Sequence, residues 1–390
     1  MKGIAILFLL CFAIVFYTYA GYALIAGVLA ALKRLSKVGF HKPDRAFQPE
    51  VSLVIPCYNE AYYLAEKVKN CQELNYPKQK LDIVFITDGS RDNSPEILSK
   101  ISGIRVLHEP ERRGKAAAEN RAMQHIRSPF VVFCDANTLL NKDAVKNIVQ
   151  HFADEKVGAV SGEKRVITTA KNAASSAGEG FYWKYESWLK KQDSILHTAA
   201  GGAGELIAFR TACFEPLEDD TILDDFVASM RIAINGFKVV YEPDAYAEEH
   251  ASLNINEEMK RKTRIAAGAW QALFRLPKAL NPFRDVLLTF IYVSHKVMRW
   301  SLAPLALLIM LPTGYLLHVE LGGWFSLFWI GQQLFYFLAL LGKILEHRKL
   351  KVKLFFIPYY FVMTNWCMIA GFVRFVKGDQ SVKWEKSKRI

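Results

Sequence analysis

Two polar residues that directly follow a hydrophobic run are suited to binding a metal ion. Asp135 and Asn137 come after the apolar residues 130–134. Their side-chain oxygens lie one residue apart along the chain, and oxygen ligands of this kind suit a hard cation such as Mg²⁺ or Mn²⁺. Such a cation would neutralise a leaving diphosphate, so we predict a metal-assisted group transfer. Capping of a turn by these side chains is the structural alternative.

An acidic pair further along the chain offers a general base. Asp224 and Asp225 precede the helical run 227–235. One carboxylate can cap that helix while the other takes a proton from an attacking hydroxyl group. We assign the base to Asp225 and keep a purely capping role for the pair as the alternative.

A polar, aromatic turn after the first hydrophobic run is suited to a nucleotide. Pro56, Tyr58 and Glu60 lie in this turn, where they could stack on a base and hydrogen-bond a ribose. Turns that contain Asn and Pro also have a purely structural explanation, so an ordinary turn remains the alternative.

Two further positions extend the predicted nucleotide site. Asp88 ends the run 83–87 and is available to accept a hydrogen bond from a base or a sugar hydroxyl. Lys115 opens a helix directly after Gly114, where a cation and backbone N–H groups would meet a diphosphate. A helix cap formed by residues 92–94 and a solvated charge run at 112–115 are the structural alternatives.

A basic helical cluster could hold the leaving diphosphate. Arg261 and Arg264 lie three residues apart, on one face of a helix, and two guanidinium groups can clamp a pyrophosphate. Contact with lipid head groups is the alternative. Glu205, in a glycine-rich patch, is a further candidate carboxylate for the sugar pocket.

Short hydrophobic runs alternate with helical stretches from residue 33 to about 258, which indicates an α/β sheet with parallel strands. Ligands of such sheets bind at the carboxyl ends of the strands, where the residues above lie. We predict a loop at 172–180, which is rich in Ala, Ser and Gly. The predicted strands are 51–55, 83–87, 104–107 and 130–134, and the predicted helices are 61–74, 93–101 and 115–127.

Four uncharged stretches approach or exceed the ~18 residues of a membrane-spanning helix. They are 3–32, 301–317, 321–342 and 354–373. Positive residues follow the first stretch and prefer the cytoplasmic side. We therefore predict a multi-pass protein of the plasma (inner) membrane, with its catalytic domain in the cytosol.

The predicted domains follow from these stretches. Residues 295–300 are expected to anchor the chain at the membrane interface through His295, Lys296, Arg299 and Trp300. Both 343–353 and 374–390 are basic, which conflicts with a crossing between them, and we favour a cytosolic tail. The domains are an N-terminal transmembrane anchor (1–32), a catalytic domain (33–256), amphipathic interface helices (257–300), a C-terminal transmembrane region (301–376) and a basic tail (377–390).

Composition excludes other classes of protein. The net charge of +12 would suit a nucleic-acid-binding protein, but the positive residues gather beside the apolar stretches, where they meet anionic lipid. We therefore expect membrane lipids and no nucleic acid as partners. The six cysteines are scattered along the sequence, which indicates reduced thiols rather than disulfides or a zinc site.

Taken in order, these motifs resemble those of the processive family-two glycosyltransferases of the membrane, the group that includes hyaluronan, cellulose and poly-N-acetylglucosamine synthases. The resemblance covers about residues 50 to 270 and implies a GT-A-like nucleotide-sugar-binding sheet. It implies that Asp88 contacts the base, that 58–60 border the nucleotide, and that Asp135 and Asn137 form the metal motif, with Asn in place of the usual second Asp.

The same resemblance implies roles for the later residues. Asp225 occupies the position of the general base, and Arg264 that of the arginine that meets the diphosphate. The family's Gln-x-x-Arg-Trp motif is altered here, because Arg261 replaces Gln and Ile265 replaces Trp.

The predicted function is that of an inverting glycosyltransferase, which moves a sugar from a UDP-sugar to a growing polysaccharide or glycan. The first alternative is a single addition to a lipid acceptor of the ceramide or polyprenyl phosphate type. The second is a non-enzymatic membrane scaffold that binds a nucleotide on the same sheet.

Overall fold

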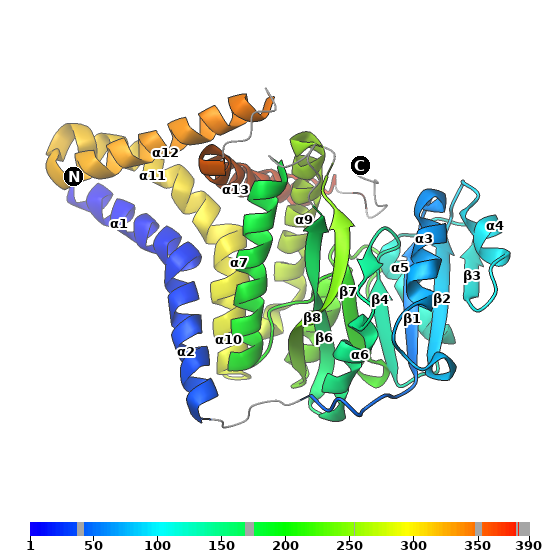
Figure 1. Cartoon of the computed structure of the whole chain (residues 1–390). Coiled ribbons are helices and arrows are strands. Elements are labelled where there is room, and N and C mark those ends of the chain that lie inside the picture. The colour runs from blue at the N-terminus through cyan, green and yellow to red at the C-terminus, as the bar shows by residue number, and fades with distance from the viewer. Residues whose placement is uncertain (37–42, 168–174, 253, 348–352, 380, 382–390) are drawn as a thin grey trace.

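The computed structural model consists of a β-sheet domain with long helices extending from one side of it (Figure 1). It describes residues 1–36, 43–167, 175–252, 254–347, 353–379 and 381. Most of the predicted basic tail, 377–390, therefore lies outside the described residues. All six cysteines are free, as predicted.

Eight strands form one sheet in the order β3-β2-β1-β4-β7-β6-β8-β5. The first four strands in the sequence pair in parallel, which confirms the prediction for this half of the sheet. The other half is mixed, because β7 runs antiparallel to β4 and β6, and β5 antiparallel to β8. The strands are β1 (Val51–Cys57), β2 (Leu81–Asp88), β3 (Arg105–Glu109), β4 (Phe130–Cys134), β5 (Leu139–Leu140), β6 (Val157–Ile167), β7 (Leu206–Arg210) and β8 (Lys238–His250).

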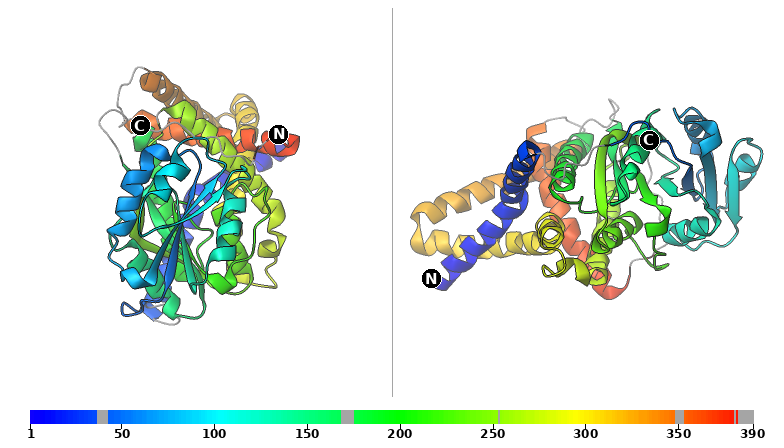
Figure 2. Two further views of the ribbon diagram at one scale, coloured as in Figure 1. Left: turned by 90° about the vertical axis from the view of Figure 1, so that its right-hand side faces the viewer. Right: turned by 90° about the horizontal axis from the view of Figure 1, so that it is seen from below.

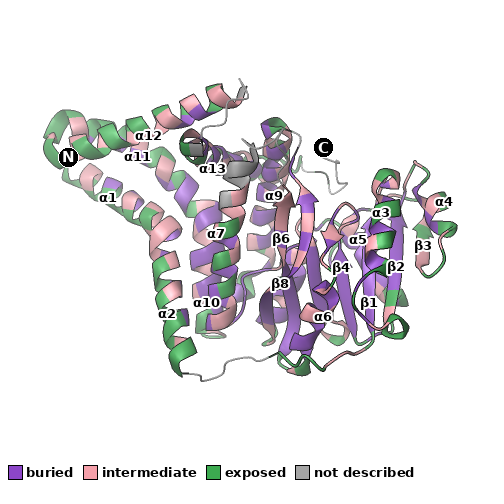
Figure 3. Ribbon diagram, viewed as in Figure 1, coloured by how far each residue is buried: buried purple, intermediate pink, exposed green. Residues whose placement is uncertain are grey.

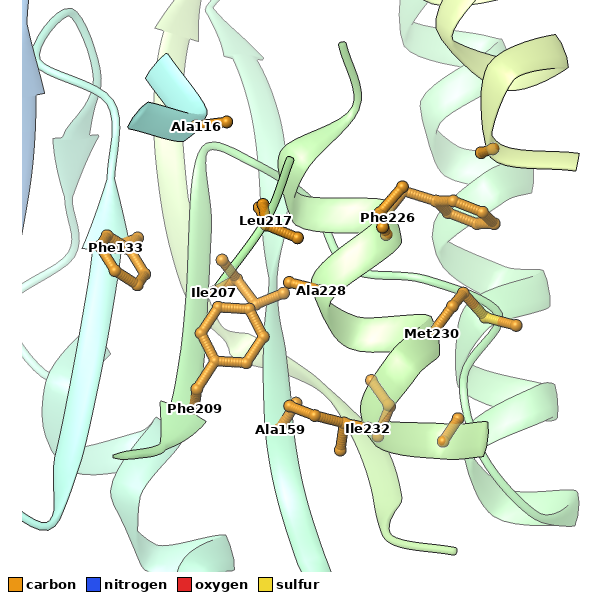
Figure 4. Packing of buried hydrophobic residues seen from close by; sticks show 14 of the residues in the cluster. Ala116, Phe133, Ala159, Ile207, Phe209, Leu217, Phe226, Ala228, Met230 and Ile232 are labelled. Atoms are coloured by element: carbon orange, nitrogen blue, oxygen red, sulfur yellow. The ribbon is translucent and has the colours of Figure 1, made fainter. Parts of the chain in front are cut away.

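Helices cover both faces of this sheet, as the view along it shows (Figure 2). The alternation of side chains along β4 explains why both faces need cover: Phe133 packs in one hydrophobic cluster, whereas Phe130 and Val132 pack in the other. On the first face, Phe133 and Phe209 lie toward α8, whose Met230 and Ile232 join the same cluster (Figure 4). The helices of this domain are α3 (Ala61–Gln72), α4 (Ser94–Ser99), α5 (Lys115–His125), α6 (Ala144–Val149), α7 (Ser175–Leu196), α8 (Asp224–Ile234) and α9 (Ile255–Arg275).

Among the residues that the structure describes, four helices are long and apolar enough to cross a membrane: Lys2–Ser36, Val286–Leu321, Gly323–Glu346 and Leu354–Lys377. The first combines α1 (Lys2–Phe16), the π-helical segment η1 (Tyr17–Gly21) and α2 (Tyr22–Ser36). The second combines α10 (Val286–Tyr292), the π-helical segment η6 (Val293–Leu302) and α11 (Ala303–Leu321), so the predicted boundary between interface and transmembrane regions at 300/301 falls inside a continuous helix. The others are α12 (Gly323–His347) and α13 (Lys353–Lys377).

These helices also pack against the sheet domain. α13 lies against α9, and α2 runs beside α7, while α1 and α11 lie side by side away from the sheet (Figure 1). Exposed apolar side chains occur along α1, α11 and α12, whereas the central strands β1 and β4 are entirely buried (Figure 3). Exposed apolar helices are what a lipid environment requires.

The predicted interfacial anchor at 295–300 is wrong. His295, Lys296, Arg299 and Trp300 are all buried, none more than 8% exposed. The physical reason is that α7 supplies carboxylates that pair with the positive side chains, which the sequence interpretation of this region did not consider.

Candidate active site

A polar cavity of about 220 Å³ lies beyond the carboxyl end of β4, between α5, α7, α8 and α9. It brings together residues that are far apart in the sequence, as predicted from the strand ends. Seven of the predicted site residues line it: Lys115, Asp135, Glu205, Asp224, Asp225, Arg261 and Arg264.

Lys115 lies at the centre of the acidic residues. Its Nζ donates to Asp135 Oδ1 at 2.9 Å and lies 3.3 Å from Asp224 Oδ2 and 3.8 Å from Glu119 Oε1. Burial alone would lower the pKa of Lys115, but the neighbouring carboxylates, Asp135 foremost, hold it well above its usual value. The ammonium group is therefore a permanent positive charge at the bottom of the cavity.

Asp225 is the carboxylate best suited to accept a proton. It lies in the first turn of α8, where Leu223 is the N-cap residue and no side chain caps the helix. A Cβ atom added to Gly204 would lie 3.3 Å from Asp225 Oδ2 and 3.4 Å from Lys115 Nζ, so both groups face this glycine. Burial and the neighbouring Asp224 raise the pKa of Asp225 to about 7.

The predicted nucleotide residues lie in an adjoining narrow cleft. Pro56, Tyr58, Asp88 and Lys115 line this cleft, and Lys115 joins it to the main cavity. The guanidinium group of Arg112 lies 3.6 Å from the centre of the Tyr58 ring.

Within this cleft, Asp88 has a structural role in addition to its predicted contact with the nucleotide. Its two carboxylate oxygens accept hydrogen bonds from the backbone N–H groups of Arg113, at 3.1 Å, and Gly114, at 2.8 Å. They hold the loop that leads into α5. Gly89 has a φ of +64°, and a Cβ atom there would lie 2.6 Å from Arg112 N, so only glycine fits this turn.

Two predicted nucleotide residues do not line the cleft: Asp135, which lines the main cavity, and Glu60. Glu60 is buried, and its backbone N–H donates to Ser94 Oγ. The preceding Asn59 has a φ of 55°, a left-handed conformation that Asn tolerates. The turn 58–60 is thus shaped in part by contacts with the loop after β2.

The predicted metal ligands offer side-chain oxygen atoms, which are the ligands that a hard cation prefers. Asp135 supplies a carboxylate, and Asn137 Oδ1 is buried without a hydrogen-bond partner among the described residues, while Asn137 Nδ2 donates to Glu249. An oxygen buried in this way requires a partner that the described protein does not provide. Within the described ranges, no three His, Cys, Asp or Glu side chains form a metal-binding group, so any cation here would also need ligands from its substrate.

The two predicted arginines differ in their surroundings. Arg261 donates through Nε and Nη2 to Glu258, whose pKa lies at about 2, because Arg261 and Lys262 outweigh the effect of burial. Arg264 lines the cavity and forms no hydrogen bond or ion pair with the described protein. Burial lowers its pKa, and Asp224 opposes this effect. Arg264 is therefore the arginine whose donors are available to a diphosphate.

Several charged residues of this region escaped the sequence analysis. Lys164 on β6 contacts both Glu205 and Glu249, which fixes Glu205 at the cavity wall. Glu186 and Lys190 reach the cavity from α7, a helix that overlaps the loop predicted at 172–180. A helical repeat of apolar residues, seen at Tyr182, Tyr185 and Leu189, was the available signal.

Residues 52–215 match the family model described as Glycosyl transferase family 2. The match covers less than half of the chain, in the region that contains β1 to β7. The poly-beta-1,6-N-acetyl-D-glucosamine synthase of Staphylococcus aureus (strain COL) is 26% identical over 235 residues, which covers 58% of this chain and 56% of that protein. The synthase of the same name from Staphylococcus epidermidis matches to the same extent. The chain thus spans about half the length of these curated relatives.

A solved structure has a similar fold over almost the entire chain. It is the mannosyltransferase PcManGT from Pyrobaculum calidifontis in complex with GDP-Man and Mn2+, with a TM-score of 0.72 and 23% identity. The similarity covers 96% of this chain and 99% of that one. The predicted GT-A-like sheet with associated helices is therefore confirmed.

Proposed function

We propose that this chain is a membrane-embedded inverting glycosyltransferase that moves a sugar from a UDP-sugar to a growing polysaccharide or glycan. The observation that carries the proposal is the position of Asp225, whose pKa of about 7 suits a general base, in one cavity with Lys115 and Arg264. The membrane-spanning helices would place the catalytic domain at the cytosolic face of the plasma membrane.

The proposed reaction is a single displacement. Asp225 takes the proton of the acceptor hydroxyl as its oxygen attacks the anomeric carbon, the bond from that carbon to the diphosphate oxygen breaks, and the nucleoside diphosphate leaves on the opposite side. Configuration is inverted, and no covalent enzyme intermediate is needed. Lys115 and Arg264 line the same cavity as Asp225, and their positive charges would stabilise the developing diphosphate by electrostatic attraction.

Asp135 and Asn137 would hold the Mg²⁺ or Mn²⁺ ion, and Lys115 shares the Asp135 carboxylate with it. A bound cation supplies further neutralisation of the diphosphate. Removal of divalent metal by a chelator is expected to abolish transfer. Full activity in the presence of chelator would contradict the role proposed for Asp135.

The proposed donor and acceptor rest on what similar proteins are named for. The staphylococcal relatives are named as synthases of an N-acetylglucosamine polymer, which favours a UDP-sugar and a polysaccharide product. The structural neighbour was solved with GDP-Man, so guanine-linked donors belong in any donor test. Asp88, Tyr58, Pro56 and Glu60 are the proposed nucleotide residues.

One observation favours the second candidate, a single addition to a lipid acceptor. A second cavity of about 250 Å³, lined by η1, α7, η6 and α13, adjoins the catalytic cavity. Three of these four elements belong to candidate membrane-spanning helices or lie within them. An acceptor that arrives from the bilayer would reach the base by this route.

The test is a panel of radiolabelled UDP- and GDP-sugars, supplied to the purified full chain in membrane mimetic, followed by sizing of the product. A ladder of products supports polymerisation, whereas one addition to an extractable lipid supports the second candidate. If no nucleotide sugar is consumed with either type of acceptor, the proposed function fails.

A further inference from the structure

The second cavity contains unused hydrogen-bonding capacity in otherwise aromatic surroundings. Arg299 on η6 lines it and donates through Nη1 to Glu186 at 2.7 Å. Its Nε and Nη2 are buried and have no hydrogen-bond partner among the described residues, and the same holds for Thr364 Oγ1. Arg299 is only 6% exposed, and buried donors of this kind require a partner. The cavity is lined by Tyr19, Tyr182, Tyr185, Arg299, Trp300, Ile357, Tyr360, Phe361, Thr364, Asn365 and Met368.

Arg299 shares its ion-pair partner with a second cation. Glu186 accepts from Arg299 and Lys296, and also contacts His295. The other nearby carboxylate, Asp193, pairs with His295 and accepts a hydrogen bond from the hydroxyl of Tyr22. An anionic ligand beside Nε and Nη2 of Arg299 would therefore complete the pairing of a buried guanidinium group.

The second cavity shares part of its wall with the candidate active site. Tyr182, Trp300 and Met368 line both cavities. The centre of the Trp300 ring lies 4.9 Å from that of Phe226, the residue after the proposed base. The second cavity is therefore adjacent to the helix that carries Asp225.

We propose that Arg299 binds the phosphate head group of a membrane lipid that carries the acceptor sugar. The planar guanidinium group presents Nε and Nη2 on one edge, which matches two phosphate oxygens. Ile357 and Phe361 on α13 contact the first part of the lipid chain, and the sugar passes Tyr182 and Trp300 toward Asp225. This inference rests on the proposed function for the role of the sugar, but the binding of lipid phosphate stands independently of it.

The test is a direct binding measurement without any sugar donor. The purified full chain, in a neutral polyoxyethylene detergent, is titrated with dodecyl phosphate and analysed by native mass spectrometry. We expect one dodecyl phosphate per chain. Inorganic phosphate and dodecyl maltoside serve as competitors, because they represent a free anion and a neutral sugar head group.

Two variants in the cavity and one matched control sharpen the test. Arg299→Lys keeps the charge beside Glu186 but loses the planar pair of donors, and we expect its affinity for dodecyl phosphate to fall about tenfold or more. Thr364→Val removes the second unpartnered group, with an expected loss of about threefold. Thr313→Val, in α11 outside both cavities, is expected to bind like the unaltered protein.

Three outcomes would overturn the proposal. Competition by inorganic phosphate at equal concentration would indicate a free anion site, and displacement by dodecyl maltoside a neutral saccharide site. Unchanged affinity in Arg299→Lys would remove the role of Arg299. UDP binding, measured on the same samples, shows whether each variant is folded. If Arg299→Lys does not fold, the affinity of Thr364→Val for dodecyl phosphate tests the proposal instead. A chain that binds lipid phosphate but transfers no sugar would refute the proposed function alone.

Discussion

The proposed catalytic cavity and the cluster of Glu186, Lys296 and Arg299 pair their charges in opposite ways. In the proposed catalytic cavity, one ammonium group, that of Lys115, contacts the carboxylates of Asp135 and Asp224. In the cluster, one carboxylate, that of Glu186, contacts Lys296 and Arg299. The pattern of ion pairs thus distinguishes two neighbouring sites that share part of their walls.

The largest effect is expected from the cluster, because one carboxylate pairs with both cations. Glu186→Gln would leave the buried Lys296 and Arg299 without the carboxylate that they share and lower the free energy of unfolding by about 3–5 kcal/mol. Glu320→Gln, at an exposed position on α11, is the control and is expected to change the free energy of unfolding by less than about 0.5 kcal/mol. Thermal unfolding in detergent measures both variants. Equal stability of the two variants would mean that Glu186 does not stabilise these cations.

In the proposed catalytic cavity, we expect replacement of a carboxylate to change activity rather than stability. Asp225→Asn removes the proton acceptor and is expected to lower turnover about 100-fold or more, with UDP affinity nearly unchanged. Asp219→Asn, in the loop that precedes α8 and paired with Arg113 at the surface, is the control. Turnover and UDP binding are measured on the same preparations. A collapse of UDP affinity in Asp225→Asn would assign Asp225 to donor binding instead.

The pH dependence of transfer tests the same carboxylate. A base must be unprotonated to act, and the pKa of Asp225 is about 7, so activity should be level above this pH. Below it, kcat/KM should fall about tenfold per pH unit, because the fraction of unprotonated base falls by that factor. A profile that stays flat down to pH 5 would show that the neighbouring Asp224 does not raise the pKa as described.

The smallest effect is expected from an exposed ion pair, which provides the reference for both cavities. Arg105 and Asp82 lie 2.7 Å apart on the sheet surface, and both side chains are more than 40% exposed. Asp82→Asn should lower the free energy of unfolding by less than about 1 kcal/mol and leave turnover unchanged. A loss as large as that in Glu186→Gln would show that burial is not what distinguishes the cluster.

The sequence was sufficient to predict the first half of the sheet and the residues at its strand ends. β4 was predicted with its observed limits, and β1 and β2 within two residues, because apolar β-branched runs bounded by polar turns give a local signal. Asp135, Asp225 and Lys115 lie in one cavity for the same reason: strand ends in a parallel sheet meet at one edge.

The remainder of the site depends on contacts that no local pattern specifies. Lys164 and Glu249 come from neighbouring strands of the mixed half of the sheet, whose pairing joins distant segments. The segment 175–180 was predicted to be a loop, because its small residues are common in loops, although it begins α7. His295 and Arg299 were assigned to the membrane interface since basic residues beside an apolar run are usually exposed there. Their carboxylate partners are more than 100 residues away in the sequence.

The hydrogen bond from the Tyr22 hydroxyl to Asp193 has a practical consequence for producing this protein. Together with the bond from Tyr19 to Asn365, it makes the first helix part of the walls around the second cavity. A truncated, detergent-free version that begins after residue 36 would lose one wall of that cavity and expose the Asp193 and His295 pair to water. Biochemical work should therefore begin with the intact polypeptide extracted from membranes.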